Sequence, residues 1–220
     1  NYTGATLGGL EVTDTSYMIV GSTVKQDANY HSNKTANVYV ATVPKDELDD
    51  SKVNYREITQ YAEDGTYSAS VPQLVKVSDD YYAVLWEELV KDGFYYHNKD
   101  DHSIVNVAFV DGEGNVLGDI QQIAGALSDC KPEIINNRVT WYVVRDGNTT
   151  FYSFSADVDN VEGFVGRMYS KALGRQAEAQ GLHDWTNRLL LGLRDGAGIS
   201  EGFIESDEFA QRKLNNSEYV

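Results

Sequence analysis

The pattern of apolar residues changes near residue 160, and this change constrains the fold more than any other feature of the chain. Before it, short runs such as 37–43 and 81–86 are rich in Val, Tyr and Ala and alternate with polar turns. Such runs are typical of β-strands. After it, apolar residues recur every three to four positions, as along one face of an α-helix. The sequence therefore predicts a β-rich region over residues 1–159 and a small helical domain over residues 160–220.

Part of the β-rich region repeats itself. Pro72 begins a run that leads through a polar turn to Trp86, and Pro132 begins a similar run that leads to Trp141. Units of this kind resemble the blades of a β-propeller, and about three of them are visible. A closed propeller needs at least four blades, so we expect an incomplete propeller-like array. A β-sandwich is the alternative, since short alternating strands are common to both folds.

Two further patterns predict local structure. The turn 111–115, which contains two glycines and an Asn, separates the runs 104–110 and 116–120 and predicts a β-hairpin. In the helical part, Gly174 is placed to end the first helix in a left-handed conformation. We expect a loop at 195–198 and two short helices after it, capped by Ser200 and Ser206.

Charge, cysteine content and hydropathy narrow the classes of protein. The formal net charge is −16, and most of it falls within residues 1–160. This balance argues against nucleic acid, which needs clustered Lys and Arg. No apolar run approaches the ~18 residues of a membrane-spanning helix, so we expect no membrane insertion. Cys130 is the only cysteine, which excludes an intrachain disulfide and a cysteine-based zinc cluster.

Three blocks in the helical part occur in a set order. They are Phe164-Val165, Met168-Tyr169 and Leu173-Gly174-Arg175, then Gly181-Leu182 and Trp185, then Gly202-Phe203, Ser206 and Glu208-Phe209. This pattern, over about residues 161–212, resembles domain-of-unknown-function family 4214, which occurs in bacterial surface and secreted proteins and is similar to phycobilisome linker domains. The resemblance implies a secreted or cell-surface location and a non-catalytic accessory role. The loop 176–180 departs from the family pattern, because it lacks the usual Asp and Pro. This difference weakens the case for a metal site in the loop.

The candidate ligand-binding residues lie in and around the long polar segment after Trp86. Aromatic and imidazole side chains on a loop can contact a ligand. We therefore predict a binding loop with a protein partner or a carbohydrate as its ligand, formed by Trp86, Phe94, Tyr95, Tyr96 and His97. The competing interpretation places Trp86 and Trp141 in the core, and their recurrence at matching positions of the repeat favours it.

The sequence contains little that indicates a catalytic site. Glu87 and Glu88 follow Trp86 and could supply a glycosidase-like carboxylate, but no second carboxylate can be assigned, so we interpret both as solvent-exposed loop acids. The chain carries no nucleophile elbow, phosphate loop or metalloprotease motif. We expect a protein that is not an enzyme.

We also expect no cofactor, with calcium as the alternative. Asp111, Glu113, Asn115 and Asp119 have the alternating spacing of a calcium loop, but Val116 stands where that loop needs glycine. A plain hairpin turn is the favoured interpretation of this segment.

These observations lead to one functional expectation and one alternative. We expect a non-catalytic module for binding or assembly, secreted or on a bacterial cell surface. Apolar sheet edges or faces at its N-terminal side would dock onto missing blades of the same protein or onto another chain. The chain begins at Asn1 instead of Met, so we also expect a mature or trimmed fragment. The alternative is the non-catalytic C-terminal portion of an extracellular hydrolase.

Overall fold

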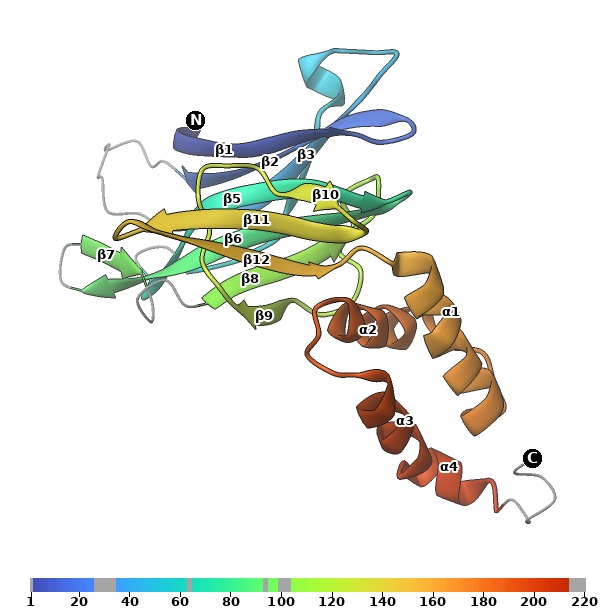
Figure 1. The fold of residues 1–220 in the computed structure, drawn as a ribbon. Coiled ribbons are helices and arrows are strands. Elements are labelled where there is room, and N and C mark those ends of the chain that lie inside the picture. The colour runs from blue at the N-terminus through green and yellow to red at the C-terminus, as the bar shows by residue number, and fades with distance from the viewer. Residues whose placement is uncertain (1, 26–34, 63–64, 93–94, 99–103, 214–220) are drawn as a thin grey trace.

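The computed structural model describes residues 2–25, 35–62, 65–92, 95–98 and 104–213. In these residues, three antiparallel sheets precede four short α-helices (Figure 1). Sheet A contains β1 (Tyr2–Val12), β2 (Ser16–Lys25), β3 (Ala36–Pro44) and β4 (Asn54–Glu57) in chain order. A single 3₁₀ turn, Asp50–Lys52, precedes β4.

Sheets B and C follow the same sequential plan. Sheet B has the order β5 (Tyr67–Ser78), β6 (Tyr81–Asp92), β8 (Ile104–Val110) and β9 (Gln121–Ala124), and β7 (Tyr95–Asn98) also pairs with β6. Sheet C contains β10 (Glu133–Ile135), β11 (Arg138–Arg145) and β12 (Asn148–Ser155).

Sheet B lies between the other two sheets, and its central strands are buried on both faces. In β6, Tyr82, Val84 and Trp86 belong to the core shared with sheet A, whereas Tyr81, Ala83 and Leu85 belong to the core shared with sheet C. Successive side chains of a strand point to opposite faces. A strand covered on both sides is therefore apolar without interruption, which explains the run 81–86.

The predicted propeller-like fold is wrong. The three sheets are consecutive units, but none is closed, and they stack on two cores without forming a propeller. The repeat in the sequence reflects the repeated strand order within each sheet. Alternation specifies which side of a strand is buried, but it does not specify how one sheet is placed against the next.

The hairpin predicted after the turn 111–115 is also largely wrong. The turn forms, since the N–H of Asp111 donates to the carbonyl of Asn115 (3.0 Å). Beyond it only a single bridge joins Val110 and Val116. The N–H of Leu117 still donates to the carbonyl of Phe109. The carbonyl of Leu117, however, accepts a hydrogen bond from the side chain of Asn187, which lies in a helix near the C-terminus. The strand that pairs with β8 on the side away from β6 is β9, which begins five residues after Val116.

The helices are α1 (Val158–Met168), α2 (Ala179–Leu190), α3 (Gly196–Ile204) and α4 (Asp207–Gln211), and a π-helical turn, Tyr169–Leu173, extends α1. Gly174 ends this first helix with φ 71°, as predicted. Ser206 caps α4, also as predicted, by accepting a hydrogen bond from the N–H of Phe209 (3.1 Å). The prediction for α3 is wrong: Asp195 caps it, and Ser200 lies inside the helix.

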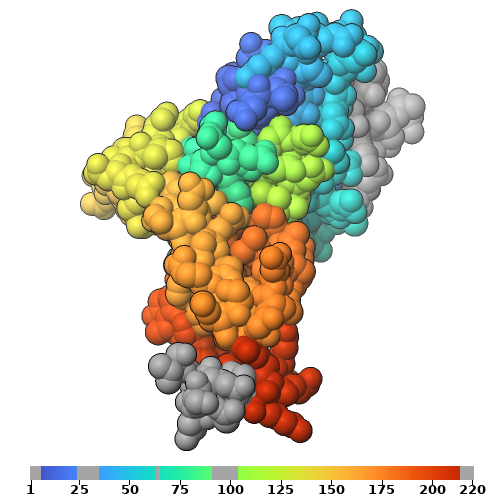
Figure 2. All heavy atoms as spheres, turned by 90° about the vertical axis from the view of Figure 1, so that its right-hand side faces the viewer, coloured from blue at the N-terminus to red at the C-terminus, as the bar shows by residue number. Residues whose placement is uncertain are grey.

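The helices project from one end of the β-rich part (Figures 1 and 2). Val158 of α1 and Leu190 of α2 are buried in the core that sheets B and C share. The side-chain carbonyl of Asn187 accepts a hydrogen bond from the Tyr81 hydroxyl (2.6 Å). The first two helices are thus packed on the sheets, and the change from strands to helices falls between Ser155 and Val158. The predicted division into two domains at 159/160 stays a prediction.

Candidate binding surfaces

Trp86 cannot offer its indole ring to a ligand, because only 1% of the residue is exposed. It packs between sheets A and B, and its Nε1 donates to the Tyr61 hydroxyl (3.3 Å). That hydroxyl donates to Glu88 (2.9 Å), and burial raises the pKa of Tyr61 well above its ordinary value. Trp141 is buried as well, and its Nε1 donates to the carbonyl of Ala126 (2.7 Å).

The rest of the predicted binding loop is described only in part. The backbone of Tyr95, Tyr96 and His97 belongs to β7, which pairs with residues 89–92 of β6. Their side chains and the whole of Phe94 lie outside the described part of the structure. The structure therefore removes Trp86 from the predicted site and leaves the other four residues as a prediction.

Glu87 is not a solvent-exposed loop acid. It lies in β6, is 2% exposed, and accepts a hydrogen bond from the N–H of Leu127 (2.7 Å). The Arg145 guanidinium lies 3.9 Å from the same carboxylate oxygen. Glu87 thus ties sheet B to the segment that leads into sheet C. The sequence did not predict this role, because an acidic residue after a strand is usually found at the surface.

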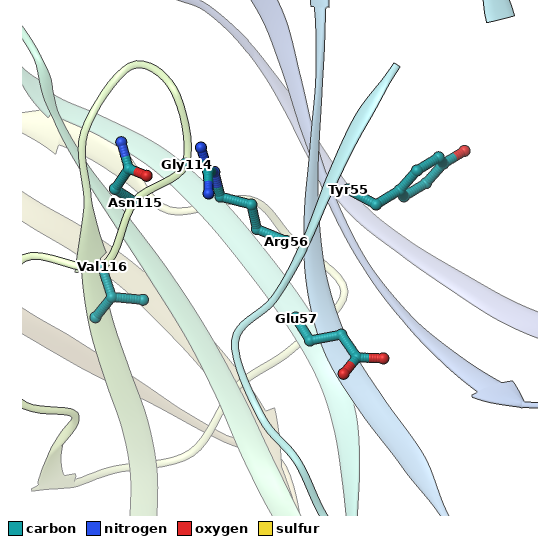
Figure 3. Close-up of a pocket in the computed structure, with 6 residues that line it drawn as sticks. All are labelled: Tyr55, Arg56, Glu57, Gly114, Asn115 and Val116. Atoms are coloured by element: carbon teal, nitrogen blue, oxygen red, sulfur yellow. The ribbon is translucent and has the colours of Figure 1, made fainter. Parts of the chain in front are cut away.

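The turn 111–115 forms one side of a shallow hollow of about 330 Å³ opposite β4 (Figure 3). Arg56 points toward this turn, whereas Tyr55 and Glu57 point to the other side of the strand (Figure 3). The Nε of Arg56 donates to the carbonyl of Glu113 (3.1 Å). Arg56, the cation among the described residues that line the hollow, is thus already held by the turn.

The carboxylate of Asp111 also serves the turn itself. It accepts hydrogen bonds from the N–H groups of Glu113 (2.9 Å) and Asn115 (2.8 Å) and from the side-chain amide of Asn115 (2.7 Å). Asp119 is bound to α2 instead, where its N–H donates to Asp184 (2.7 Å). Among the described residues, no three His, Cys, Asp or Glu side chains are grouped as metal ligands.

A second hollow, of about 370 Å³, lies where the first strands of sheets A and B meet the loop before β10. It is lined by Thr6, Leu7, Gly8, Gly9, Val71, Pro72, Gln73, Asp129 and Lys131. Both strands are bulged here, and Val71 has φ 48°, a strained value for a β-branched residue. Lys131 is paired with Glu11 (2.6 Å), and Gln73 donates to the carbonyl of Ser128 (2.9 Å). These polar contacts join the three sheets to one another.

A third candidate surface is the outer face of sheet A. Met18 and Val20 of β2 face the core, so the alternating residues of β2 and their cross-strand partners face outward. From the strand registers, the apolar residues of this outer face are Leu7, Leu10, Val12, Tyr17, Ile19, Tyr39, Ala41, Val43 and Tyr55. Leu7, Leu10 and Tyr55 are 71%, 55% and 65% exposed.

The composition of this face is unusual for a surface that meets water. Antiparallel sheets covered on one side normally carry polar residues on the other. Here Tyr39 and Tyr55 lie side by side, with ring centroids 6.0 Å apart. Glu57 is a charged residue that the registers place on the same side, opposite Tyr39. Contiguous exposed apolar surface of this kind marks interaction sites. The run 37–43, which contributes β3 to this face, is apolar at most of its positions on both sides of the strand.

In the helical part, the residues of the three sequence blocks form a core. Val165, Tyr169 and Phe203 are buried there, with Phe164, Trp185 and Phe209 packed around them. Arg175 bridges the helices, since its guanidinium donates to Glu178 and, through two nitrogens, to Glu208. Gly181 leaves room for the Tyr169 hydroxyl, which would lie 2.2 Å from a Cβ at that position. The pattern is thus accounted for by packing.

Residues 147–213 match the model of a protein family described as "Domain of unknown function (DUF4214)". The match covers β12 and the four helices, which is the C-terminal part of the chain. No curated protein and no solved structure matches the chain. Among the described helices, none combines the length and apolarity needed to cross a membrane. The C-terminal part is therefore similar to a family whose function is undefined.

Proposed function

We propose that the chain is a non-catalytic module for binding or assembly, which docks onto a second protein through the outer face of sheet A. The observation that carries this proposal is the row of exposed apolar side chains on that face, with Leu7, Leu10 and Tyr55 the most exposed. The partner presents an apolar sheet face of its own. This chemistry follows from the molecule itself, where the inner face of sheet A and both faces of sheet B are covered by sheets.

The energetic argument rests on apolar area. Removing apolar surface from water stabilises a contact by roughly 25 cal/mol per Å². Association also costs translational and rotational freedom, so only a well-packed face gives a stable complex. The sheet supplies such a face, because antiparallel pairing along β1 to β4 holds its backbone, with bulges only in β1.

We place the module outside a bacterial cell, either secreted or on the surface. What supports this location is the resemblance of the helical part to a family that occurs in such proteins. The non-catalytic C-terminal portion of an extracellular hydrolase is the second candidate and shares this location. Treating intact producing cells with a protease, and comparing the cleavage of this protein with that of a cytosolic marker, tests the location.

The docking face is tested by two double variants with matched exposure. Leu7→Ser with Leu10→Ser changes the outer face, at residues 71% and 55% exposed. Leu48→Ser with Ile204→Ser is the control, at residues 69% and 53% exposed that lie outside strands β1 to β4. Both pairs should leave the free energy of unfolding nearly unchanged, within about 0.5 kcal/mol per substitution.

A photo-crosslinking residue at Val12, introduced into the full chain in producing cells, reports the contact. We expect a discrete cross-linked protein that disappears in the Leu7→Ser, Leu10→Ser background and persists in the control background. Cross-linking that is the same in both backgrounds would rule out the outer face as the docking site. A cross-linked product with twice the mass of the chain would identify the partner as a second copy.

A further inference from the structure

Sheet C lacks the short fourth strand that follows the third strand in sheets A and B. In sheet A the third strand, β3, pairs with the four-residue strand β4, and in sheet B the third strand of the path, β8, pairs with the four-residue strand β9. In sheet C the third strand is β12, and in the described part of the chain it pairs only with β11. The chain turns into α1 three residues after β12, so it adds no fourth strand there.

The hairpin geometry shows which backbone groups of β12 face the open edge. Asp146 and Gly147 have φ 50° and 75°, so they form a two-residue turn closed by the pair Arg145 and Asn148. Hydrogen-bonded and non-hydrogen-bonded pairs alternate along an antiparallel ladder. The N–H and C=O groups of even-numbered residues therefore point to β11, and those of Thr149, Phe151, Ser153 and Ser155 point outward.

These outward groups are largely unused. The carbonyl of Ser153 accepts a hydrogen bond from the Arg138 guanidinium (3.2 Å). Outside the β11–β12 ladder, the described residues show no hydrogen bond to Thr149 or Phe151. Both residues are exposed. An edge stretch of about four residues is thus available, which is the length over which β4 and β9 pair with their neighbours.

The edge of β12 also lacks the features that usually protect a free strand. Natural edge strands are kept short, bulged, charged or interrupted by Pro. The edge strand β1 is bulged, β5 is bulged and contains Pro72, and β10 has three residues. β12 has eight residues in unbroken register, and it carries neither Pro nor a charged side chain.

We propose that β12 binds an extended segment of a partner protein, which adds to sheet C as its fourth strand. The segment pairs antiparallel to β12 over about four residues at Thr149–Tyr152. By analogy with β9, whose Ile123 packs on the core of sheets B and C, it carries an apolar residue facing that core. The chain has a net charge of −16, so charge complementarity favours basic residues on the flanks of the segment. Main-chain hydrogen bonds supply the affinity and the alternate side chain supplies specificity, as in other cases of strand addition. This site is independent of the outer face of sheet A.

The test uses a fluorescent peptide that repeats the strand Gln121–Ala124 between flanking lysines, titrated into the full chain. We expect saturable binding in fluorescence anisotropy. In hydrogen-exchange NMR, the amides of Thr149 and Phe151 should exchange quickly in the free protein and slowly with the peptide. The amides of Thr150 and Tyr152 should be protected in both states, because they bond to β11.

A pair of variants at one position separates the backbone from the side chain. Thr149→Pro removes the outward N–H and should weaken the peptide about fivefold, which is about 1 kcal/mol at 1.4 kcal/mol per tenfold change. Thr149→Ala loses the same hydroxyl but keeps the N–H and should bind as the wild type does. Pro is tolerated at such an outward position of an edge strand, so both variants should fold, as circular dichroism would check.

Three results would overturn the proposal. The first is equal binding of the peptide by Thr149→Pro and Thr149→Ala. The second is the absence of any peptide binding, or protection that appears away from β12. The third is protection of Thr149 and Phe151 without peptide, together with a concentration-dependent dimer in sedimentation that Thr149→Pro abolishes. This last result would assign the edge to a second copy of the chain.

Discussion

Single residues decide where the sheets can approach one another. A Cβ at Gly8 would lie 1.7 Å from the carbonyl oxygen of Pro72, so β1 and β5 meet only because that position has no side chain. Glu87 shows the converse case, since a buried carboxylate holds the backbone of Leu127. Sequence patterns predicted that Trp86 and Trp141 favour the core, because they recur at matching positions. They could not predict Gly8 or Glu87, because the partners of both residues are distant in the chain.

Two glycine substitutions should therefore have opposite effects on stability. Gly8→Ala should lower the free energy of unfolding by about 2–3 kcal/mol, because the added methyl group meets backbone that cannot move without disturbing the bulge in β5. Gly166→Ala in α1, where nothing lies within 4 Å of the added Cβ, should raise it by about 0.5–1 kcal/mol. Urea denaturation followed by fluorescence measures both. Equal effects at the two positions would show that the approach of β1 and β5 is wrongly described.

Among the elements, the short helices were the easiest to predict and the short strands the hardest. The apolar stripe from Phe164 to Leu173 and the position of Gly174 predicted the first helix and its end. The strands β4, β7 and β9 have four residues each and were not predicted. Four residues carry too little alternation to stand out, and their existence depends on the neighbouring strand that binds them. The cap of α3 shows the same limit, because both Asp195 and Ser200 are suitable capping residues by type.

The ionic bridge between α4 and the first helix should make the helical part sensitive to acid. Hydrogen bonds from Arg175 are the largest cause that lowers the pKa of both Glu178 and Glu208. A carboxyl group whose pKa is lowered on folding stabilises the fold above its unfolded pKa, near 4.5. That contribution is lost as the pH falls through the lower, folded value. Glu208→Gln should therefore be less stable than the wild type at about pH 7, and the difference should shrink below about pH 4.

Thermal unfolding followed by circular dichroism at a series of pH values measures this difference. Glu205→Gln is the control, because Glu205 is an exposed glutamate just before α4, whereas the described carboxylate partners of Arg175 are Glu178 and Glu208. A constant difference between Glu208→Gln and the wild type across the pH range would show that the bridge to Arg175 does not form.

In the whole molecule, the helices and the sheets share a core. Leu190 of α2 is 1% exposed and belongs to the cluster that contains Phe109 and Trp141. Its neighbour Leu189 packs instead in the separate cluster of the helical part. The predicted boundary at 159/160 followed the change in sequence pattern, but a change from strand to helix does not require two independently folding units. Whether the two parts unfold together is a property of the contact between them.

This shared core predicts a single cooperative unfolding transition. Leu190→Ala should destabilise the chain by about 2–4 kcal/mol and shift the helix signal and the tryptophan fluorescence together. Leu189→Ala is the matched control. In a Trp185→Phe background, where the fluorescence comes from Trp86 and Trp141 of the sheets, it should affect the helix signal more than the fluorescence if the helices can loosen on their own. Two separate transitions in calorimetry of the wild type would support two independent domains and contradict the single transition.

The local features of this protein can be predicted from its sequence: the order of strands before helices, most strand positions, the left-handed end at Gly174 and the cap at Ser206. These depend on residues close together in the chain, whose backbone preferences and alternation act locally. Other features are visible only in the folded molecule: the sheets stack around sheet B instead of forming a propeller, Glu87 is buried, and β12 keeps an open edge. Each of these depends on which distant segment covers a given face or edge, and a local pattern of apolar residues does not carry that information.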